Sequence, residues 1–398
     1  MSNRLTTRES GFSLVEMMAS VALGAIVLSA AVQMYTKGLS ATWMVTQRAE
    51  MQEDFRAASN MMTKDLSLAG AGLGTGAAIA LPSGVTPQYG CDQTKTCYIN
   101  GAAGLYPLNG ATPYMYGLIP GYNKGPILNV TQGATDVVTV IYTDPSFYLN
   151  CYTPQVTSKG VVTFSQPVSP NTWASEGCLP NPVTVPQAPN DAAAGLTAGD
   201  VVMMTLNSST IVAEVTGAVS TSGSGATMTY SVPFADNDPL KLNQTGAGTG
   251  LNSVPLNAVG ASSAAPCGSQ GPCRILIVTY YIDNTVSPPR LMRQVSGHSP
   301  MPVVENVAWM KFSYDMFNDS TDSPATGCAN PGSATPACTS GSSVGLLPNQ
   351  ITKINILNMA INSTQMGSQF GLNYGYQRMD LQTSVCARNL TYNNNYPN

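Results

Sequence analysis

The sequence predicts an α+β protein in which one long N-terminal α-helix packs on a large antiparallel, β-rich head with long loops. Three observations support this class. Residues 12–35 are almost entirely apolar, residues 36–69 carry apolar side chains on one side only, and residues 70–398 alternate strand-like segments with stretches rich in Gly, Pro, Ser, Thr and Asn. We therefore divide the chain into residues 1–11, 12–35, 36–69 and 70–398.

The first apolar segment is long enough to cross a membrane. It covers 24 residues from Phe12 to Tyr35, and as a helix it would reach about 36 Å, against a hydrocarbon core of about 30 Å. Arg4 and Arg8 precede it, with only Glu9 opposing them. This basic excess predicts a cytoplasmic N-terminus and places the rest of the chain outside the cytoplasm.

Glu16 is the one carboxylate inside this span. A secretory signal peptide is the first alternative, with removal near Ala30 and Ala31. An ionisable side chain inside a span costs about 2.5 to 3.5 kcal/mol on insertion scales and is functional by default. We therefore favour a functional Glu16; the simpler interpretation is a glutamate that reaches the membrane interface from the edge of a span.

Residues 11–16, GFSLVE, resemble the class III signal of type IV prepilins. In that family a membrane prepilin peptidase cuts after the glycine and methylates the new amine. The resemblance implies a leader of residues 1–11, cleavage between Gly11 and Phe12, N-methylation of Phe12, and Glu16 as the fifth mature residue. Pairing the new amine with Glu16 removes two isolated charges from a low-dielectric place. Between neighbouring subunits, the same pair would set the axial register of a helical stack.

The helix is expected to continue beyond the span as an amphipathic segment. Apolar residues recur at steps of three and four, at Met51, Phe55, Ala58, Met62, Leu66 and Ala69. No proline interrupts residues 12–69, and Gly70 supplies a C-terminal stop. These 58 residues would measure about 87 Å as a helix. The GAGLGTG run at 70–76 follows a helix instead of a strand, so we interpret it as an exit loop and not as a phosphate site.

Eight segments of the head are predicted as strands. They are residues 135–143, 200–206, 210–216, 226–232, 274–282, 303–316, 351–361 and 376–388. The apolar residues of 351–361 do not hold one phase, which indicates a bulge near Lys353 or Leu357. The intervening loops, near 82–125, 144–195, 235–270 and 317–350, are where binding functions would reside.

The order of several segments resembles the PilW type of minor pilin. The helix end DFRAASNMMTKDLSLAGAG is followed by TDVVTVIYT, AGDVVMM, TIVAEVTG, VTYYID, RLMRQ, VVENVAWMKFSYD and RMDLQTSVCARN. The resemblance implies a pilin-like fold and, as partners, other minor pilins, the major pilin and an inner-membrane assembly platform. Two departures are Cys386, where an aliphatic residue is expected, and the longer loops of the head.

The nine cysteines predict a disulfide framework, because an exported head meets an oxidising compartment. Neighbour pairing joins Cys91 to Cys97, Cys151 to Cys178, Cys267 to Cys273, and Cys328 to Cys338, although spacing alone does not fix connectivity. Cys386 is left as a free thiol or an intermolecular link. Zinc is disfavoured because the chain has one histidine.

Catalysis, cofactors and nucleic-acid binding have little support in the sequence. His298, the only histidine, lies in a GHSP turn without a nucleophile or acid pattern, so we expect a surface or locally bonded side chain and no enzyme activity. Net charge is −4 and no basic run supplies a phosphate footprint. An acidic stretch with carboxylate and amide oxygens misses the spacing of an EF-hand, so a solvated turn is favoured over calcium. Its residues are Asp315, Asn318, Asp319 and Asp322.

These expectations favour a structural protein over an enzyme. The favoured hypothesis is a minor pilin of the bacterial inner membrane that joins other minor pilins in a complex that primes or tips a type IV pilus. A pseudopilin of a type II secretion system is the alternative within the same class. A pilus-tip adhesin, whose disulfide-closed loops bind a surface or ligand, is the alternative of another class.

Overall fold

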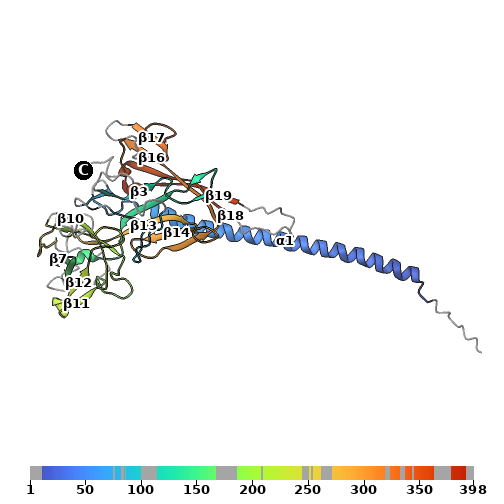
Figure 1. Ribbon diagram of the computed structural model, residues 1–398, viewed down its shortest axis with the longest axis horizontal. Helices are drawn as coiled ribbons and strands as arrows, with labels where there is room; N and C mark the ends of the chain where they lie inside the picture. The colour runs from blue at the N-terminus through green and yellow to red at the C-terminus, as the bar shows by residue number, and fades with distance from the viewer. Residues whose placement is uncertain are drawn as a thin grey trace, which may run out of the picture. The chain divides into compact units, whose positions relative to one another are not determined.

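A computed structural model describes the chain in several ranges. These are residues 11–74, 77–81, 85, 87–99, 114–166, 186–207, 209–243, 251, 254–260, 271–318, 323–331, 337–342, 345–362 and 378–390. They form one long helix and a head of antiparallel sheets, which confirms the predicted α+β class (Figure 1). The chain divides into two compact units, and the boundary falls inside the helix, after Asp54.

Helix α1 runs from Leu14 to Ser67, within the predicted limits. Its amphipathic stripe is buried at every predicted position from Met51 to Ala69. After Ser67 the chain makes tight turns, and Gly70 adopts a left-handed conformation with φ of +78°. Glycine takes this conformation without the steric cost of a Cβ atom, so Gly70 acts as the predicted helix stop.

The head is built around a seven-stranded antiparallel sheet. Its main path is β10 (Ser209–Glu214), β9 (Val201–Leu206), β13 (Cys273–Asp283), β14 (Arg290–Val295) and β15 (Met301–Glu305). Strand β6 (Val137–Thr143) pairs with both β13 and β3 (Leu118–Gly121). The long strand β13 therefore pairs with three others along its length and forms the centre of the head.

Two four-stranded sheets and two hairpin-sized sheets complete the described part of the head. One four-stranded sheet has the order β11 (Ser220–Ser222), β12 (Thr229–Pro233), β8 (Val161–Ser165) and β7 (Thr153–Ser158). The other has the order β17 (Ser323–Cys328), β16 (Val307–Asn318), β18 (Ile351–Asn362) and β19 (Arg378–Cys386). The small sheets pair β1 (Ala78–Ala80) with β2 (Tyr114–Tyr116), and β4 (Ile127–Asn129) with β5 (Gly133–Ala134). Short 3₁₀ turns lie at Leu149–Cys151, Gly225–Thr227 and Pro348–Gln350.

Two clusters of buried apolar side chains lie in the described part of the head. One includes Ile141, Ile275 and Tyr281 of the central sheet. The other joins β9 and β10 to the sheet of β7, β8 and β12, and it includes Met204 and Phe164. In β8, Val162 and Phe164 are buried and their neighbours are half-buried. This alternation follows from the strand geometry, in which successive side chains point to opposite faces of the sheet.

The predicted strands are present, but the structure differs from the prediction in several places. Strand β14 was not predicted, nor were strands inside predicted loops, such as β2 and β3 in 82–125 and β17 in 317–350. Residues 303–316 form two strands, because Asn306 has a φ of +60° and separates β15 from β16. The predicted loop 144–195 contains the short strands β7 and β8, which are joined by a turn at Gly160. The expected irregularity in β18 is confirmed, since the pairing with β16 skips Leu357 and also Thr352, next to Lys353.

Candidate functional site

The start of α1 carries a reciprocal cap between Ser13 and Glu16. The backbone N–H of Ser13 donates to Glu16 Oε2 at 3.2 Å, and the backbone N–H of Glu16 lies 3.4 Å from Ser13 Oγ. A free helix start leaves several N–H groups without partners, and this capping box satisfies two of them. It also fixes the carboxylate of Glu16 at the first turn, next to the positive end of the helix dipole.

The predicted cleavage site lies immediately before this cap. Gly11 and Phe12 precede the helix, and the Phe12 side chain is 89% exposed. Near Gly11 no described atom would lie within 4 Å of an added Cβ. The peptide bond between these residues is therefore in an open, non-helical segment. The predicted leader cations Arg4 and Arg8 lie outside the described residues.

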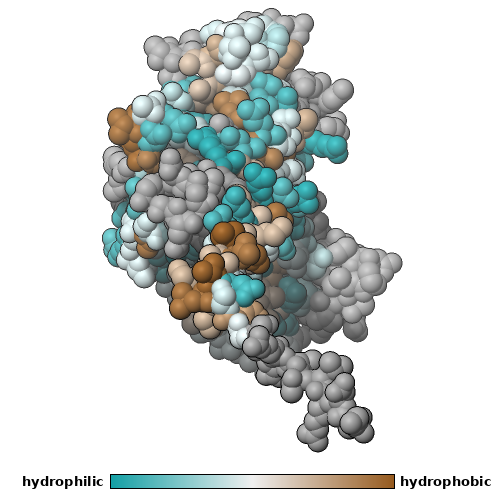
Figure 2. All heavy atoms as spheres, turned by 90° about the vertical axis from the view of Figure 1, so that its right-hand side faces the viewer, coloured by the Kyte–Doolittle hydropathy of each residue, from teal (hydrophilic) through white to brown (hydrophobic). Residues whose placement is uncertain are grey.

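The first half of α1 presents apolar side chains to its surroundings. Every residue from 11 to 39 is exposed, and the exposed apolar side chains are brown in Figure 2. By length and composition, this helix contains a stretch that is long and apolar enough to cross a membrane. Hydroxyl side chains in this part of the helix donate hydrogen bonds to backbone carbonyls of the preceding turn. Ser20 Oγ, for example, donates to the carbonyl of Glu16 at 2.8 Å. An apolar helix without a covering core fits membrane anchoring.

The other end of α1 is fastened to the head by Asp65. This side chain accepts hydrogen bonds from Tyr142 Oη at 3.0 Å, Tyr280 Oη at 2.7 Å and Arg293 Nε at 2.7 Å. These partners stand on β6, β13 and β14, so one carboxylate joins the helix to three strands. Burial, together with the Asp65 charge, raises the pKa of both tyrosines well above its ordinary value. Burial alone would lower the pKa of Arg293, but its bond to Asp65 outweighs that effect and raises it.

A close approach of the backbone follows at Gly72. Its φ is +70°, and a Cβ there would lie 2.0 Å from Thr143 Oγ1. The chain is drawn in by bonds from the Gly70 N–H to the carbonyl of Ile141 and from the Thr143 N–H to the carbonyl of Ala71, both 2.9 Å. The glycine-rich exit therefore docks on β6, which supports its interpretation as a connection and not as a phosphate loop.

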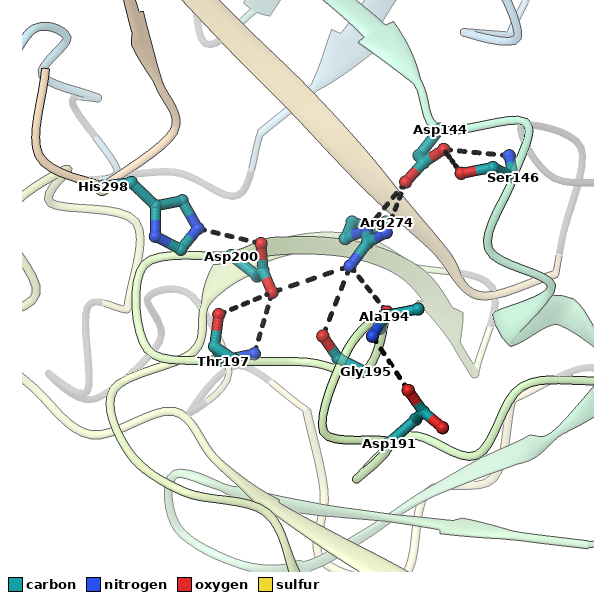
Figure 3. A network of polar contacts seen from close by, with 9 residues as sticks. All are labelled: Asp144, Ser146, Asp191, Ala194, Gly195, Thr197, Asp200, Arg274 and His298. Atoms are coloured by element: carbon teal, nitrogen blue, oxygen red, sulfur yellow. Dashed lines mark hydrogen bonds and ion pairs between the residues drawn. The ribbon is translucent and has the colours of Figure 1, made fainter. Parts of the chain in front are cut away.

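Figure 3 shows a polar network around Arg274, at the start of β13. Arg274 donates to Asp144 Oδ2 from Nε at 2.9 Å and from Nη2 at 2.6 Å, and its Nη1 donates to the carbonyls of residues 194 and 195. His298 Nε2 lies 3.0 Å from Asp200 Oδ1. Although burial alone would raise the pKa of Asp144, hydrogen bonds from Ser146 and the Arg274 pair lower it. The network fastens the loop before β9 to the central sheet, and His298 is locally bonded, as expected.

A second buried network brings two carboxyl groups together. Glu214, at the end of β10, accepts from the Leu240 N–H at 3.0 Å and from Gln93 Nε2. Asp238 accepts from the backbone N–H groups of residues 242 and 243 at 2.7 and 2.9 Å. Burial, with Asp238 close by, raises the pKa of Glu214 to about 9. Burial and the nearby Asp238 therefore favour the protonated form of Glu214.

Two disulfides fit the neighbour pairing. Cys91 is bonded to Cys97, and Cys328 is bonded to Cys338. Cys151 and Cys273 are also disulfide-bonded, and their predicted partners, Cys178 and Cys267, lie outside the described residues. Cys386 is free and exposed. Each bridge with both ends described closes a short segment, of six residues in one case and ten in the other.

The acidic stretch near 315 is only partly described. Asp315 Oδ1 accepts from the Gly327 N–H at 2.9 Å and from Asn355 Nδ2 at 3.2 Å, so it is used within its sheet. Asp319 and Asp322 lie outside the described residues. Within the described ranges, no group of three or more His, Cys, Asp or Glu side chains has an arrangement that could hold a metal ion.

Residues 6–32 match a family model described as the prokaryotic N-terminal methylation motif. The match contains Gly11, Phe12 and Glu16, which lie at the exposed start and first turn of α1. It supports a type IV pilin-like protein, and it implies processing by a prepilin peptidase and assembly by a pilus-type machinery. No curated protein and no solved structure matches the chain.

Proposed function

We propose that the protein is a minor pilin that takes part in type IV pilus assembly, in a priming or tip complex with other minor pilins. The observation that carries the proposal is the methylation motif on a helix that continues without a break from Leu14 to Ser67 and ends in a β-rich head. The order of PilW-like segments along the head supports the minor-pilin assignment. The major pilin and the inner-membrane assembly platform are the further partners.

The proposed pathway begins in the inner membrane with a cytoplasmic N-terminus and a periplasmic head. The prepilin peptidase cuts between Gly11 and Phe12 and methylates the new amine. Residues 12–35 then leave the lipid and pack among the helices of other subunits. Their exposed apolar surface supports this step, because packing against apolar neighbours replaces packing against lipid.

Glu16 is proposed to set the register of the new subunit. Its only hydrogen-bond donor within the described chain is the Ser13 N–H. A carboxylate in an apolar assembly needs a positive partner, because an uncompensated buried charge is strongly destabilising. The methylated amine of Phe12 in a neighbouring subunit supplies that charge. The role of the protein is then structural, with no catalysis of its own.

The first experiment is intact-mass and N-terminal analysis of the protein from membranes and from sheared filaments. The proposal expects a chain that begins with methylated Phe12 and is present at low abundance in filaments. A start near Ala31, or an unprocessed Met1 confined to membranes, would contradict it. Deletion of the gene then separates the alternatives. Loss of pili supports the proposal, loss of secretion with intact pili supports a pseudopilin, and lost attachment with normal pili supports an adhesin.

A matched pair of variants tests Glu16. Glu16→Ala is expected to be cleaved and methylated but to be missing from sheared filaments. Glu50→Ala is the control, because Glu50 is exposed on the same helix beyond the span. Quantitative mass spectrometry of the filament fraction measures incorporation. Equal incorporation of the two variants would refute the proposed role of Glu16.

A further inference from the structure

The side chain of Lys311 meets an amide and a carboxylate that come from different strands of the head. Lys311 stands in the middle of β16, Asn123 follows β3, and Asp136 immediately precedes β6. Lys311 Nζ donates to Asn123 Oδ1 and, at 2.7 Å, to Asp136 Oδ1. A nucleophile, a carbonyl-type carbon and a proton acceptor are thus within contact of one another.

Asp136 is held rigidly between these elements. Its Oδ1 accepts from the Asn123 backbone N–H at 2.8 Å, and its Oδ2 accepts from the Phe312 N–H at 3.0 Å. Its own N–H donates to the Met310 carbonyl at 3.0 Å. The residue is 2% exposed. Both carboxylate oxygens and the backbone of Asp136 are therefore held in place. The carboxylate stays within hydrogen-bond distance of Lys311 Nζ.

The surroundings of the amine limit the access of water. The Lys311 side chain is only 16% exposed, and its Nζ lies 4.7 Å from the ring centroid of Tyr122 and 5.5 Å from that of Trp309. Burial raises the pKa of Asp136, although its hydrogen bonds with Asn123 and Lys311 oppose this. A carboxylate with a raised pKa is a better proton acceptor, and a sheltered lysine is the type that acts as a nucleophile.

We propose that Lys311 and Asn123 are joined by an intramolecular isopeptide bond, with Asp136 as the proton carrier. Asp136 takes a proton from Lys311 Nζ, and the nitrogen lone pair attacks Asn123 Cγ. The new N–C bond forms and the tetrahedral carbon collapses. Asp136 returns the proton to the amide nitrogen, and the old C–N bond breaks with release of ammonia. The regenerated Asp136 carboxylate takes a second proton from the attacking nitrogen and passes it to the released ammonia, which departs as ammonium, and the third Nζ proton stays in the new amide. The reaction therefore needs no oxidant or co-reactant.

The position of Asn123 suits the leaving step. Asn123 is exposed to solvent and has a φ of +56°. Because it is exposed, its side chain lies on the solvent side of the three groups formed by Lys311, Asn123 and Asp136. Ammonia released there escapes to solvent, which makes the reaction irreversible in practice. The fold itself supplies the proximity, since the reacting groups are fixed by three strands rather than brought together by collision.

The bond would join two sheets covalently. Lys311 belongs to the sheet of β17, β16, β18 and β19, whereas Asn123 and Asp136 flank β3 and β6 of the seven-stranded sheet. The bonds of Asp136 to the backbone of Met310 and Phe312 already cross between these sheets. A covalent link would resist separation of the sheets under load. This consequence holds for any exported head and does not rest on the proposed pilus function.

Mass spectrometry of the purified full-length protein, after reduction of its disulfides, tests the bond. The proposal expects an intact mass lower by one ammonia than the mass of the same processed chain. Trypsin should fail to cut after Lys311, so the peptide of residues 96–124 should appear linked to that of residues 294–353. An unaltered mass together with cleavage after Lys311 would overturn the proposal. Loss of one water with a link to Asp136 would overturn the assignment of Asn123.

Three variants and a control make the test specific. Lys311→Arg keeps a positive charge beside Asp136 but should abolish the ammonia deficit, as should Asn123→Ala. Asp136→Asn should leave the peptides unlinked because the proton carrier is gone. Lys353→Arg is the control, since Lys353 lies on the neighbouring strand with its Nζ 3.8 Å from a carboxylate oxygen of Asp315. It should keep the full deficit. A deficit that persists in Lys311→Arg would refute the proposal.

Discussion

Replacement of Asp65 by alanine is the sharpest test of how the helix is fastened to the head. Asp65 is 4% exposed and receives bonds from Tyr142, Tyr280 and Arg293, all at 3.0 Å or less. Removing one partner of a buried ion pair costs about 3 to 5 kcal/mol, because the other charge stays buried without compensation. Each hydroxyl left without an acceptor adds about 1 to 3 kcal/mol, although these costs are not additive within one network.

We expect Asp65→Ala to lower the free energy of unfolding by about 3 to 5 kcal/mol. Urea unfolding of the full-length chain in detergent, followed by tryptophan fluorescence, measures the change, since Trp309 is buried in the head. Lys64→Ala is the control, because Lys64 is the exposed preceding residue and surface substitutions usually stay within about 0.5 kcal/mol.

A double-mutant cycle separates the ion pair from the packing. Asp65→Ala combined with Arg293→Met should cost clearly less than the sum of the single changes, because the second substitution removes the orphaned cation. Two results would refute the view that this network fastens the helix. One is that the losses of unfolding free energy in the double variant are additive, and the other is that Asp65→Ala loses no more than Lys64→Ala.

Two further predictions concern glycine and pH. Gly72→Ala should cost about 1 to 3 kcal/mol more than Gly133→Ala, because both have positive φ but only Gly72 would place its Cβ against Thr143, whereas the space near Gly133 is open; equal unfolding midpoints would contradict this. Burial raises the pKa of Glu214 from 4.5 to about 9, so between these values the folded state binds more protons than the unfolded state and stability should fall as pH rises. Glu214→Gln, which mimics the protonated acid beside Asp238, should flatten that dependence in pH-resolved urea titrations, and an unchanged slope would contradict a raised pKa of Glu214.

The helix and its termini follow from local sequence rules. Apolar spacing located the buried stripe, and the absence of proline before Gly70 predicted its length. Several of the predicted strands have long apolar runs, such as TDVVTVIYT, whereas strands such as β2, β3, β14 and β17 were not predicted. Strands β7 and β8 were missed because their five or six residues include polar ones and lie on either side of a turn at Gly160. Short strands of this kind are decided by their neighbours in the sheet.

The candidate sites also differ in how far apart their residues lie in the sequence. Gly11, Phe12 and Glu16 form a contiguous motif, so sequence alone identified them. Ser13 was part of the motif, but its capping bond with Glu16 was not predicted. The signal for it was present, because a serine followed three residues later by a glutamate is typical of a helix start. The Lys311 and Asp65 contacts join residues separated by 77 to 228 positions. Neither spacing nor composition carries that information, because long-range pairing depends on sheet order.

The two carboxylates of α1 show how the helix differs along its length. Asp65 is buried, and Arg293 of the same chain neutralises it at 2.7 Å. Glu16 is surrounded by exposed apolar side chains, and within the described residues it is bonded to the uncharged backbone of Ser13. A lone carboxylate in an apolar medium is unstable unless a cation joins it. The head therefore supplies the positive partner of Asp65 from its own residues, whereas Glu16 at the other end of the helix still requires a positive partner. Under the proposed function, cleavage after Gly11 creates such a charge as the amine of Phe12, so the processing site and Glu16 would act in one mechanism.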